Sequence, residues 1–285
     1  MKHFFIITNA LKDEEMHLTQ KVISYIQLKG GTASYAISVG EDGHHAISME
    51  MIPNDTECIF VIGGDGTLIR AARDVVATKI PLIGINRGNL GYLCELEEDT
   101  VFDAIDELLI NHFIVEKRMM LNGYMIKNNE KTAGITALND IVIHRTGSLH
   151  IITLNVFVNH EYVYSFMADG IIIATPTGST GYSMSAGGPI VDPKAKMLLM
   201  TPINSHTLNS KSIVVSPEDE IIIEMDAGKN DKNDQVEVSF DGDNSMQLEV
   251  GDRIVVHKAP VYAPILKISK ISFLEILRKK MQTYT

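Results

Sequence analysis

Five residues in the first quarter of the chain, Gly63–Thr67 (GGDGT), combine the residue types that handle phosphate with a single carboxylate. Glycines let the backbone approach a ligand closely, and a helix that begins after them presents unpaired N–H groups with about half a positive charge. Asp65 is unusual there, because a carboxylate repels phosphate unless it holds a magnesium ion or accepts a proton from an attacking hydroxyl. The alternative is that Asp65 caps the helix while the glycines only turn the chain. The pentapeptide alone leaves both interpretations open.

A second segment, Thr175–Pro189 (TPTGSTGYSMSAGGP), is rich in glycine, serine and threonine and follows an apolar run. Hydroxyl and exposed N–H groups together can hydrogen-bond phosphate or ribose without any formal charge. This suits a chain with a formal net charge of -11, from 36 acidic and 25 basic residues. The same acidic excess repels a phosphate backbone, so we expect no nucleic-acid partner. The segment is long and dense in hydrogen-bonding groups for a plain loop, and we interpret it as functional.

Neither of the common nucleotide fingerprints occurs in the sequence. No G-x-x-x-x-G-K-[ST] is found, and G-x-G-x-x-G does not fit after Gly64 because Ile69 occupies the third glycine position. His44 and His45 lack a third ligand at a fitting spacing, so we predict no metal site built from side chains. His144 alternates with apolar residues in a strand-like run, and we interpret it as a packing residue.

The elements that would position the glycine segment alternate between strands and helices. Apolar runs predict strands, and apolar residues at helical spacing predict helices. The strands are His3–Thr8, Thr32–Val39, Cys58–Ile62 and Ile80–Ile85, and the helices are Asp13–Lys29, Thr67–Ala77 and one around Val101–Leu108, with a polar loop at Glu41–His45. Strands that are apolar on both faces and separated by helices predict a parallel sheet covered on both sides. Ligands bind beyond the carboxyl ends of such strands, where Gly63–Thr67 falls.

From Arg118 to about Pro260 the pattern predicts mostly strands. These are Ala137–His144, Ile151–Asn159, Tyr162–Met167, Gly170–Thr175, Glu220–Met225, Gln235–Phe240 and Asp252–Lys258, with a hairpin turn at Asn159-His160 and an exposed loop at Gly228–Asp234. Phe273, Leu277 and Met281 repeat at helical spacing in a final helix, whose apolar face we expect to return to the first domain. We therefore predict an α/β domain over residues 1–117 with 265–285, and a β-rich domain over 118–264.

Composition and the start of the chain indicate the compartment. Hydrophobic residues make up 45% of the chain, and the two cysteines, Cys58 and Cys94, have neither metal nor redox spacing, which fits a reducing compartment. The first apolar run reaches Thr8 and Asn9 too soon for a signal peptide, and no stretch approaches the roughly 20 apolar residues of a membrane span. We expect a soluble, cytoplasmic protein with no membrane partner.

Taken together, Gly63–Thr67 and Thr175–Pro189 resemble the two signature segments of the NAD kinase family. Asn86–Leu93 and Leu138–Asp140 join them in the family's order, and the resemblance runs through nearly the whole chain. GGDGT alone is shared with diacylglycerol and sphingosine kinases, whereas the long Thr/Ser/Gly segment is specific. The resemblance implies transfer of the terminal phosphate of ATP to the 2′-hydroxyl of the adenosine ribose of NAD, giving NADP. It also implies ATP or polyphosphate as donor, a magnesium ion with the ATP, and a homodimer or homotetramer.

The resemblance also assigns residues. Asp65 matches the proton acceptor, and the phosphate-binding loop is Gly63, Gly64, Gly66 and Thr67. The positions that match contacts to NAD in the β-rich, dinucleotide-binding domain and around the loop are Asp65, Gly66, Arg70, Tyr92, Asn139, Asp140, His150, Met167, Asp169, Thr180, Gly181, Tyr182, Ser183, Met184 and Ser185. Some depart from the family's pattern: Asp140 replaces a Glu, Gly181 a common Ala, Met167 an Arg of some members, and Asp243 a common Gln.

Two alternatives stay open at this point. A lipid kinase of the diacylglycerol kinase type shares GGDGT, but it should carry a basic membrane-facing patch or an apolar groove, and the net charge disfavours the patch. A dinucleotide-binding regulator without catalysis would use most of the same residues, although it would not need Asp65. The kinase interpretation depends on Asp65 and Thr175–Pro189 lining one cleft between the two domains.

Overall fold

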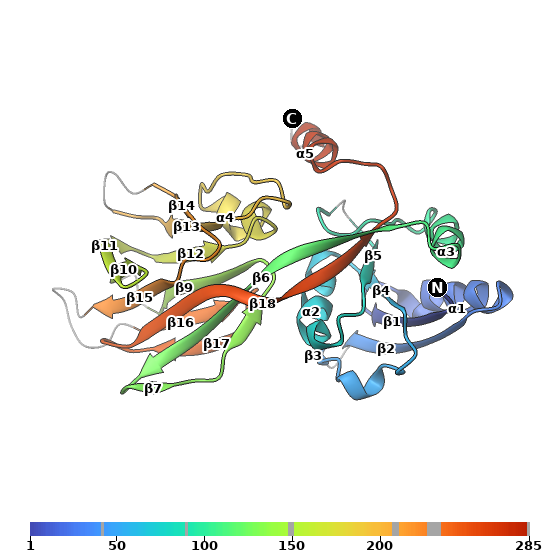
Figure 1. The fold of residues 1–285 in the computed structure, drawn as a ribbon, viewed down its shortest axis with the longest axis horizontal. Helices are drawn as coiled ribbons and strands as arrows, with labels where there is room; N and C mark the ends of the chain where they lie inside the picture. The colour runs from blue at the N-terminus through green and yellow to red at the C-terminus, as the bar shows by residue number, and fades with distance from the viewer. Residues whose placement is uncertain (41–42, 89–90, 148–150, 207–210, 227–234, 284–285) are drawn as a thin grey trace. The chain divides into compact units, whose positions relative to one another are not determined.

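The computed structural model describes residues 1–40, 43–88, 91–147, 151–206, 211–226 and 235–283 (Figure 1). The chain divides into two compact units, one of Met1–Arg118 with Val261–Thr285 and one of Met119–Pro260. Two long strands, β6 (Ile114–Lys127) and β18 (Arg253–Lys267), carry the chain from one unit into the other. The predicted fold class is confirmed: the first unit is α/β with a parallel sheet, and the second is rich in β-strands.

The first unit is built on a parallel sheet. Its strands lie in the order β2 (Thr32–Gly40), β1 (His3–Asn9), β4 (Cys58–Gly63) and β5 (Leu82–Asn86). Ile265, near the end of β18, extends this sheet by pairing in parallel with Leu82. Every residue of β4 and β5 is buried, which accounts for their uninterrupted apolar sequence. The polar loop predicted at Glu41–His45 is partly wrong, because β3 (Gly43–His44) pairs with the end of β2.

Helices of the first unit bury their apolar faces on this sheet. They are α1 (His17–Leu28), α2 (Asp65–Asp74) and α3 (Val101–Leu109). The unit also contains α5 (Phe273–Thr283), in which none of residues 273–282 is buried, and the 3₁₀ turns η1 (Glu14–Met16), η2 (Met49–Met51) and η3 (Val76–Thr78). The helix predicted over Asp13–Lys29 is interrupted, since Glu15 and Met16 adopt positive φ angles of 52° and 58°. Beyond the break, the Asp13 carboxylate accepts the N–H groups of Leu18 and Thr19. The side chain of Asp13 therefore fixes where α1 begins.

The second unit contains antiparallel strands around a large hydrophobic core, with a smaller cluster at Val142, Ile172, Ala174, Leu199 and Ile203. In one sheet the strands lie in the order β11 (Glu161–Ala168), β10 (Ile152–Val158), β15 (Ile221–Asp226) and β18; β6 pairs with β18 and also with β7 (Glu130–Lys131) and β8 (Ile135–Ala137). In the other sheet the order is β14 (Ile213–Val215), β13 (Leu198–Ile203), β12 (Gly170–Ala174), β9 (Asp140–Thr146), β16 (Gln235–Phe240) and β17 (Asp243–Leu248). Side chains such as Leu154, Phe166, Ile171, Ile223 and Phe240 fill the core. Two short turns, η4 (Gly178–Thr180) and α4 (Tyr182–Ser185), follow β12.

Two details of the second unit test the sequence predictions. The hairpin turn at Asn159-His160 is confirmed, because both residues have positive φ angles (51° and 66°) between the antiparallel β10 and β11. The single strand predicted over Ala137–His144 is wrong, because it breaks at Leu138 and Asn139 into β8 and β9. The loop predicted at Gly228–Asp234 lies outside the described residues. None of the helices in the described ranges is long and apolar enough to cross a membrane.

Candidate functional site

The glycine segment forms a tight connection between β4 and α2. A β-carbon added at Gly63 would lie 2.4 Å from Thr67 Oγ1, so only glycine lets Thr67 fold back against the strand end. Gly64 is the N-cap of α2 and Asp65 its first residue. Gly66 is exposed, with no atom within 4 Å of the place where a β-carbon would stand. The start of α2 is therefore open at Gly66, where helix N–H groups can meet an anion.

Asp65 is held by backbone donors from another loop. Its Oδ2 accepts the N–H of Tyr92 at 2.6 Å, and its Oδ1 accepts those of Leu93 and Cys94 at 3.2 and 3.1 Å. The side chain therefore orients toward the loop after β5 instead of capping α2. A carboxylate has about four lone-pair sites. Of the three backbone bonds, Oδ1 accepts two and Oδ2 one, so Oδ2 has the greater capacity to accept from a further donor, such as a hydroxyl.

The loop after β5 is shaped to receive this carboxylate. A β-carbon at Gly91 would lie 2.0 Å from Asp65 Oδ1, so a larger residue there would displace the carboxylate. The neighbouring thiol of Cys94 is buried, and its pKa is raised well above its usual value by burial and by the charge of Asp65. The thiol therefore stays protonated and chemically quiet, as expected for a cysteine without metal or redox spacing.

The second unit contains two adjoining pockets. The larger encloses about 470 Å³ and is lined by Asn139, Asp140, Val142, His144, Tyr182, Glu237, Ser239, Asp241 and Gly242. The smaller encloses about 260 Å³ and is lined by His144, Arg145, Asp169, Tyr182, Ile203 and Asn204. His144 and Tyr182 line both pockets. Four residues assigned from the resemblance, Asn139, Asp140, Asp169 and Tyr182, thus lie around one region.

Asp241 organises the floor of the larger pocket. Its carboxylate accepts the N–H groups of Leu138, Asn139 and Asp140 at 2.8, 2.7 and 3.1 Å, which explains why the predicted strand breaks there. Asp140 is only 6% exposed. Burial, and secondarily the negative charge of Asp241, raises the pKa of Asp140 to about 7. Sequence reasoning missed Asp241, because Asp-Gly between two strands is typical of a plain hairpin turn.

A second carboxylate in this region has the opposite electrostatic environment. Arg145 Nε donates to Asp169 Oδ1 at 2.6 Å, and Asn204 Nδ2 donates to Asp169 Oδ2 at 2.9 Å. These donors, Arg145 first, lower the pKa of Asp169 below its usual value. Asp169 is therefore ionised at neutral pH. Arg145 and Asn204 were not among the predicted residues. His144, which we interpreted as a packing residue, is half-buried and lines both pockets.

The hydroxyl-rich segment, Thr175–Pro189, is hydrogen-bonded to Leu138 and Asn139, whose N–H groups Asp241 accepts. Thr175 donates from its N–H to Asn139 O at 2.8 Å and from Oγ1 to Leu138 O at 2.7 Å. A β-carbon at Gly178 would lie 2.1 Å from Asn139 O, so glycine is needed at that contact. Other hydroxyls are internal: Ser179 donates to Pro176 O, and Ser183, fully buried, bonds Thr201. Part of the segment's hydrogen-bonding capacity thus builds the loop itself.

Two family models match the chain. Residues 4–113 match the ATP-NAD kinase N-terminal domain, and residues 138–268 match the ATP-NAD kinase C-terminal domain. The chain belongs to the NAD kinase family. Both matches are to ATP-NAD kinase domains, so they do not support the lipid-kinase alternative, which was based on GGDGT and a two-domain plan.

Curated NAD kinases resemble the chain along their full length. The NAD kinase of Agathobacter rectalis is 55% identical over 100% of both chains. That of Lachnospira eligens is 40% identical over 99% of this chain and 100% of its own. Two solved structures share the fold. Yeast NADH kinase complexed with NADH has a TM-score of 0.86 and 23% sequence identity, and the match covers 99% of this chain and 88% of that one. An NAD kinase from Archaeoglobus fulgidus in complex with ATP has a TM-score of 0.77 and 22% sequence identity, and the match covers 99% of both chains.

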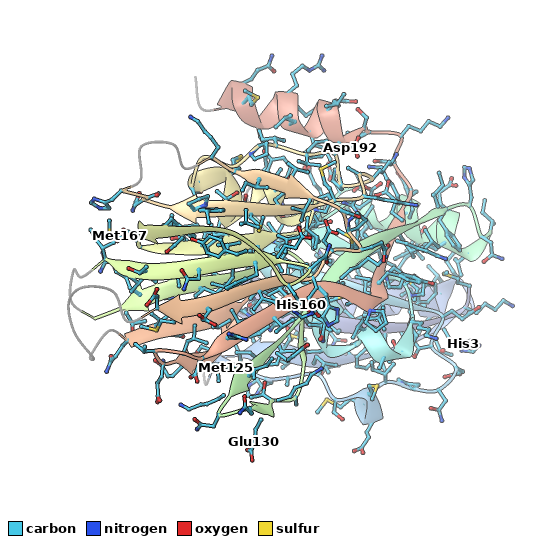
Figure 2. The ribbon with its side chains drawn as sticks, turned by 60° about the vertical axis from the view of Figure 1, so that its left-hand side comes forward. His3, Met125, Glu130, His160, Met167 and Asp192 are labelled. Carbon is cyan, nitrogen blue, oxygen red and sulfur yellow. The ribbon has the colours of Figure 1, made fainter. Side chains whose placement is uncertain are left out.

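Other residues assigned from the NAD kinase family lie as follows. Arg70 Nη1 contacts His44 Nδ1 at 3.2 Å. The Tyr92 ring lies 6.2 Å from that of Phe273, with the Lys280 ammonium 4.3 Å from its centroid. Met167, labelled in Figure 2, lies on β11, is 52% exposed and lines neither of the two pockets.

The remaining NAD kinase positions lie in or near α4, except one. Thr180 is half-buried and donates to Thr177 O at 3.4 Å. A β-carbon at Gly181 would lie 3.6 Å from Asp140 Oδ2, so the loop passes close to that carboxyl group. Met184 and Ser185 are exposed on α4. His150 lies outside the described residues.

Proposed function

We propose that this chain transfers the terminal phosphate of ATP to the 2′-hydroxyl of the adenosine ribose of NAD, giving NADP and ADP. The observation that carries the proposal is the Asp65 carboxylate. It is fixed by three backbone N–H groups at the start of α2, where the helix also offers N–H groups to phosphate, in a chain of the NAD kinase family.

Asp65 would act on the attacking hydroxyl. As the 2′-oxygen forms a bond to the terminal phosphorus, the bond from that phosphorus to the bridging oxygen of ADP breaks, and the hydroxyl proton passes to Asp65 Oδ2. The N–H groups of Tyr92, Leu93 and Cys94 hold the carboxylate in one orientation before substrate arrives. Such preorganisation lowers the barrier, since the carboxylate need not be reoriented during the reaction.

The pockets of the second unit would hold the nucleoside parts of NAD. Their lining is rich in acceptors, with the carboxylates of Asp140, Asp169, Glu237 and Asp241. Acceptors of this kind suit ribose hydroxyls and the exocyclic amine of adenine, and they disfavour the pyrophosphate. We propose that these pockets bind NAD and that the group on which Asp65 acts is the 2′-hydroxyl of that substrate.

The donor is ATP in this proposal, with magnesium bound to it. Among the described residues, no group of three His, Cys, Asp or Glu side chains is placed to hold a metal ion. Magnesium would therefore be held mainly by the phosphate oxygens, which is common for this ion, and would neutralise their charge. Inorganic polyphosphate as donor is tested in the same assay by replacing ATP.

Assembly and location complete the proposal. Cys58 and Cys94 are both free and buried, which fits a reducing compartment such as the cytoplasm. We propose a homodimer or homotetramer, which light scattering coupled to size-exclusion chromatography would distinguish from a monomer.

The first prediction concerns the proton acceptor. Asp65→Asn should lower kcat by about 10²–10⁴-fold, because an amide cannot take the hydroxyl proton, while the Kd for NAD changes little. Initial rates of NADP formation and calorimetric NAD binding measure the two quantities. Asp103→Asn, the same change at an exposed position of α3, is the matched control. Turnover at the parental level in Asp65→Asn would remove Asp65 from this role.

The parent protein must also be tested for the reaction itself. Incubation with NAD, ATP and magnesium should give NADP and ADP in equal amounts by mass spectrometry, and omission of any reactant should abolish both. A protein that binds NAD without forming NADP would be a regulator. Dispersed diacylglycerol in place of NAD serves as the substrate control.

A further inference from the structure

Lys12 lies in the loop after β1, beside the glycine loop that follows β4. The two strands pair in parallel, so their loops leave the same edge of the sheet. Asn9 joins the loops: its Nδ2 donates to Thr67 Oγ1 at 3.4 Å, and its carbonyl accepts the Lys12 N–H at 3.0 Å. The Lys12 ammonium lies 2.8 Å from the place where a β-carbon at Gly64 would stand. The ammonium therefore rests against the backbone of the glycine loop.

The backbone of Lys12 is fixed from a third loop. Arg87, which follows β5, donates from Nε to Lys12 O at 3.2 Å and from its N–H to Gly63 O at 2.6 Å. The loops after β1, β4 and β5 are thus linked at one edge of the sheet, which is the ligand-binding edge of parallel sheets. The backbone of Lys12 is thus held by hydrogen bonds, whereas its side chain is exposed and can adjust to a ligand.

The charge of Lys12 is not neutralised by a neighbour. Within the described ranges, no carboxylate forms an ion pair with its ammonium, whereas Arg87 pairs with Glu98. A chain with a net charge of -11 repels a polyphosphate in general, so a local cation is needed where one binds. The helix N–H groups supply only partial charge. A lysine ammonium supplies a full positive charge on a flexible stem.

We propose that Lys12 Nζ donates to a phosphate oxygen of the nucleotide held at the Gly63–Thr67 loop. This inference rests on the proposed function, which places the donor phosphates there. The triphosphate of ATP and the pyrophosphate of NAD offer the same chemistry, and the separate Michaelis constants distinguish them. Lys12 binds and neutralises phosphate in this assignment, while Asp65 handles the proton.

The experiment compares Lys12→Met with the parent, with Lys12→Arg and with Lys2→Met. Lys2 is exposed and precedes the opposite end of β1, so its replacement makes the same charge change away from the loop. Lys12→Met should raise the KM of one nucleotide by about 10–100-fold, the loss of one charge-assisted hydrogen bond, and leave the other KM within about twofold. A rise for ATP assigns the contact to the donor, and a rise for NAD assigns it to the acceptor. Lys12→Arg should restore most of the affinity, and Lys2→Met should resemble the parent.

A binding measurement separates this inference from the proposed function. Calorimetry with inorganic tripolyphosphate needs no turnover, and Lys12→Met should weaken that binding by a similar factor while the melting temperature stays unchanged. If the parent forms no NADP, the proposed function fails, but the tripolyphosphate result still decides the role of Lys12. Unchanged Michaelis constants together with unchanged tripolyphosphate binding in Lys12→Met would overturn the proposal.

Discussion

Carboxylates in this chain repeatedly bind consecutive backbone N–H groups. Asp65 binds those of Tyr92, Leu93 and Cys94, and Asp241 binds those of Leu138, Asn139 and Asp140. Charge-assisted bonds of this kind are stronger than neutral ones, so each carboxylate fixes a loop that has no regular structure of its own. Part of the acidic excess in the composition is therefore structural.

At the scale of one residue, Asp140 gives a pH-dependent prediction. Its pKa is about 7 in the folded protein, against roughly 4 when unfolded. Between these values the folded state binds more protons, so Asp140 lowers stability as pH rises from about 4 to about 7. Asp140→Asn removes that penalty. Denaturant unfolding should find the variant more stable than the parent by about 1–4 kcal/mol at pH 8, and nearly equal to it at pH 4. A difference independent of pH would contradict this account.

Gly91 gives a second prediction at this scale. A β-carbon there would lie 2.0 Å from Asp65 Oδ1, so Gly91→Ala must move the carboxylate while leaving Gly63–Thr67 unchanged in sequence. Misplacement of a reacting group by about 1 Å can cost about 10²-fold in rate, so kcat should fall by at least that factor. Steady-state kinetics with NAD and ATP check it. Parental kcat in Gly91→Ala would show that the contact with Asp65 does not govern turnover.

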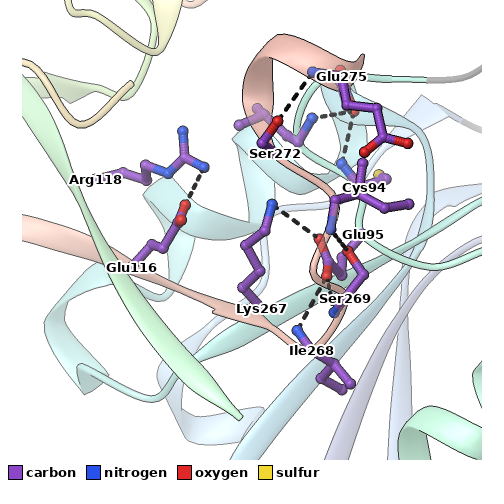
Figure 3. A network of polar contacts seen from close by, with 12 residues as sticks. Cys94, Glu95, Glu116, Arg118, Lys267, Ile268, Ser269, Ser272 and Glu275 are labelled. Carbon is purple, nitrogen blue, oxygen red and sulfur yellow. Dashed lines mark hydrogen bonds and ion pairs between the residues drawn. The ribbon is translucent and has the colours of Figure 1, made fainter. Parts of the chain in front are cut away.

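At the scale of elements, Glu95 ties the end of β18 to the loop that holds Asp65 (Figure 3). Its Oε1 accepts the N–H groups of Ile268 and Ser269 at 3.1 and 2.6 Å, and Lys267 Nζ lies 3.8 Å from Oε2. The preceding residue, Cys94, donates its N–H to Asp65. Consecutive residues of one loop therefore anchor the returning C-terminal segment and orient the proposed proton acceptor.

Glu95→Gln tests this tie. The amide oxygen can still accept both N–H groups, but these bonds lose their charge assistance and the amide nitrogen would face the Lys267 ammonium. The variant should therefore lose about 1–3 kcal/mol of stability. Thermal or denaturant unfolding measures the loss, with Glu97→Gln, an exposed neighbour, as the control. Equal stability of the two variants would show that Glu95 contributes nothing beyond a surface carboxylate.

The same elements show what the sequence can and cannot predict. Strands β1, β4 and β5 were readable because they are buried on both faces, and α3 because its apolar spacing is regular. The breaks before α1 and between β8 and β9 were not readable, because Asp13 and Asp241 cause them through side-chain contacts. Asp241 lies 101 to 103 residues from the N–H groups that it binds.

The site follows the same division. Asp65, Asn139 and Asp140 were found because they belong to segments of recognisable sequence. Asp241 and Lys12 were not found, because each acts through a loop that only folding brings near. In the sequence, nothing distinguishes Asp241 from other aspartates or Lys12 from other lysines of the chain.

At the scale of the whole molecule, the second unit is an insertion within the first. The chain leaves the first unit after Arg118 and re-enters it at Val261, and Leu266 then completes the core that holds Phe60 and Ile62. During synthesis, every residue of the inserted unit leaves the ribosome before Leu266 does. The inserted unit can therefore fold before the sheet of the first unit is complete. Glu95, in the loop that binds Asp65, can form its bonds to Ile268 and Ser269 only after these residues have been synthesised.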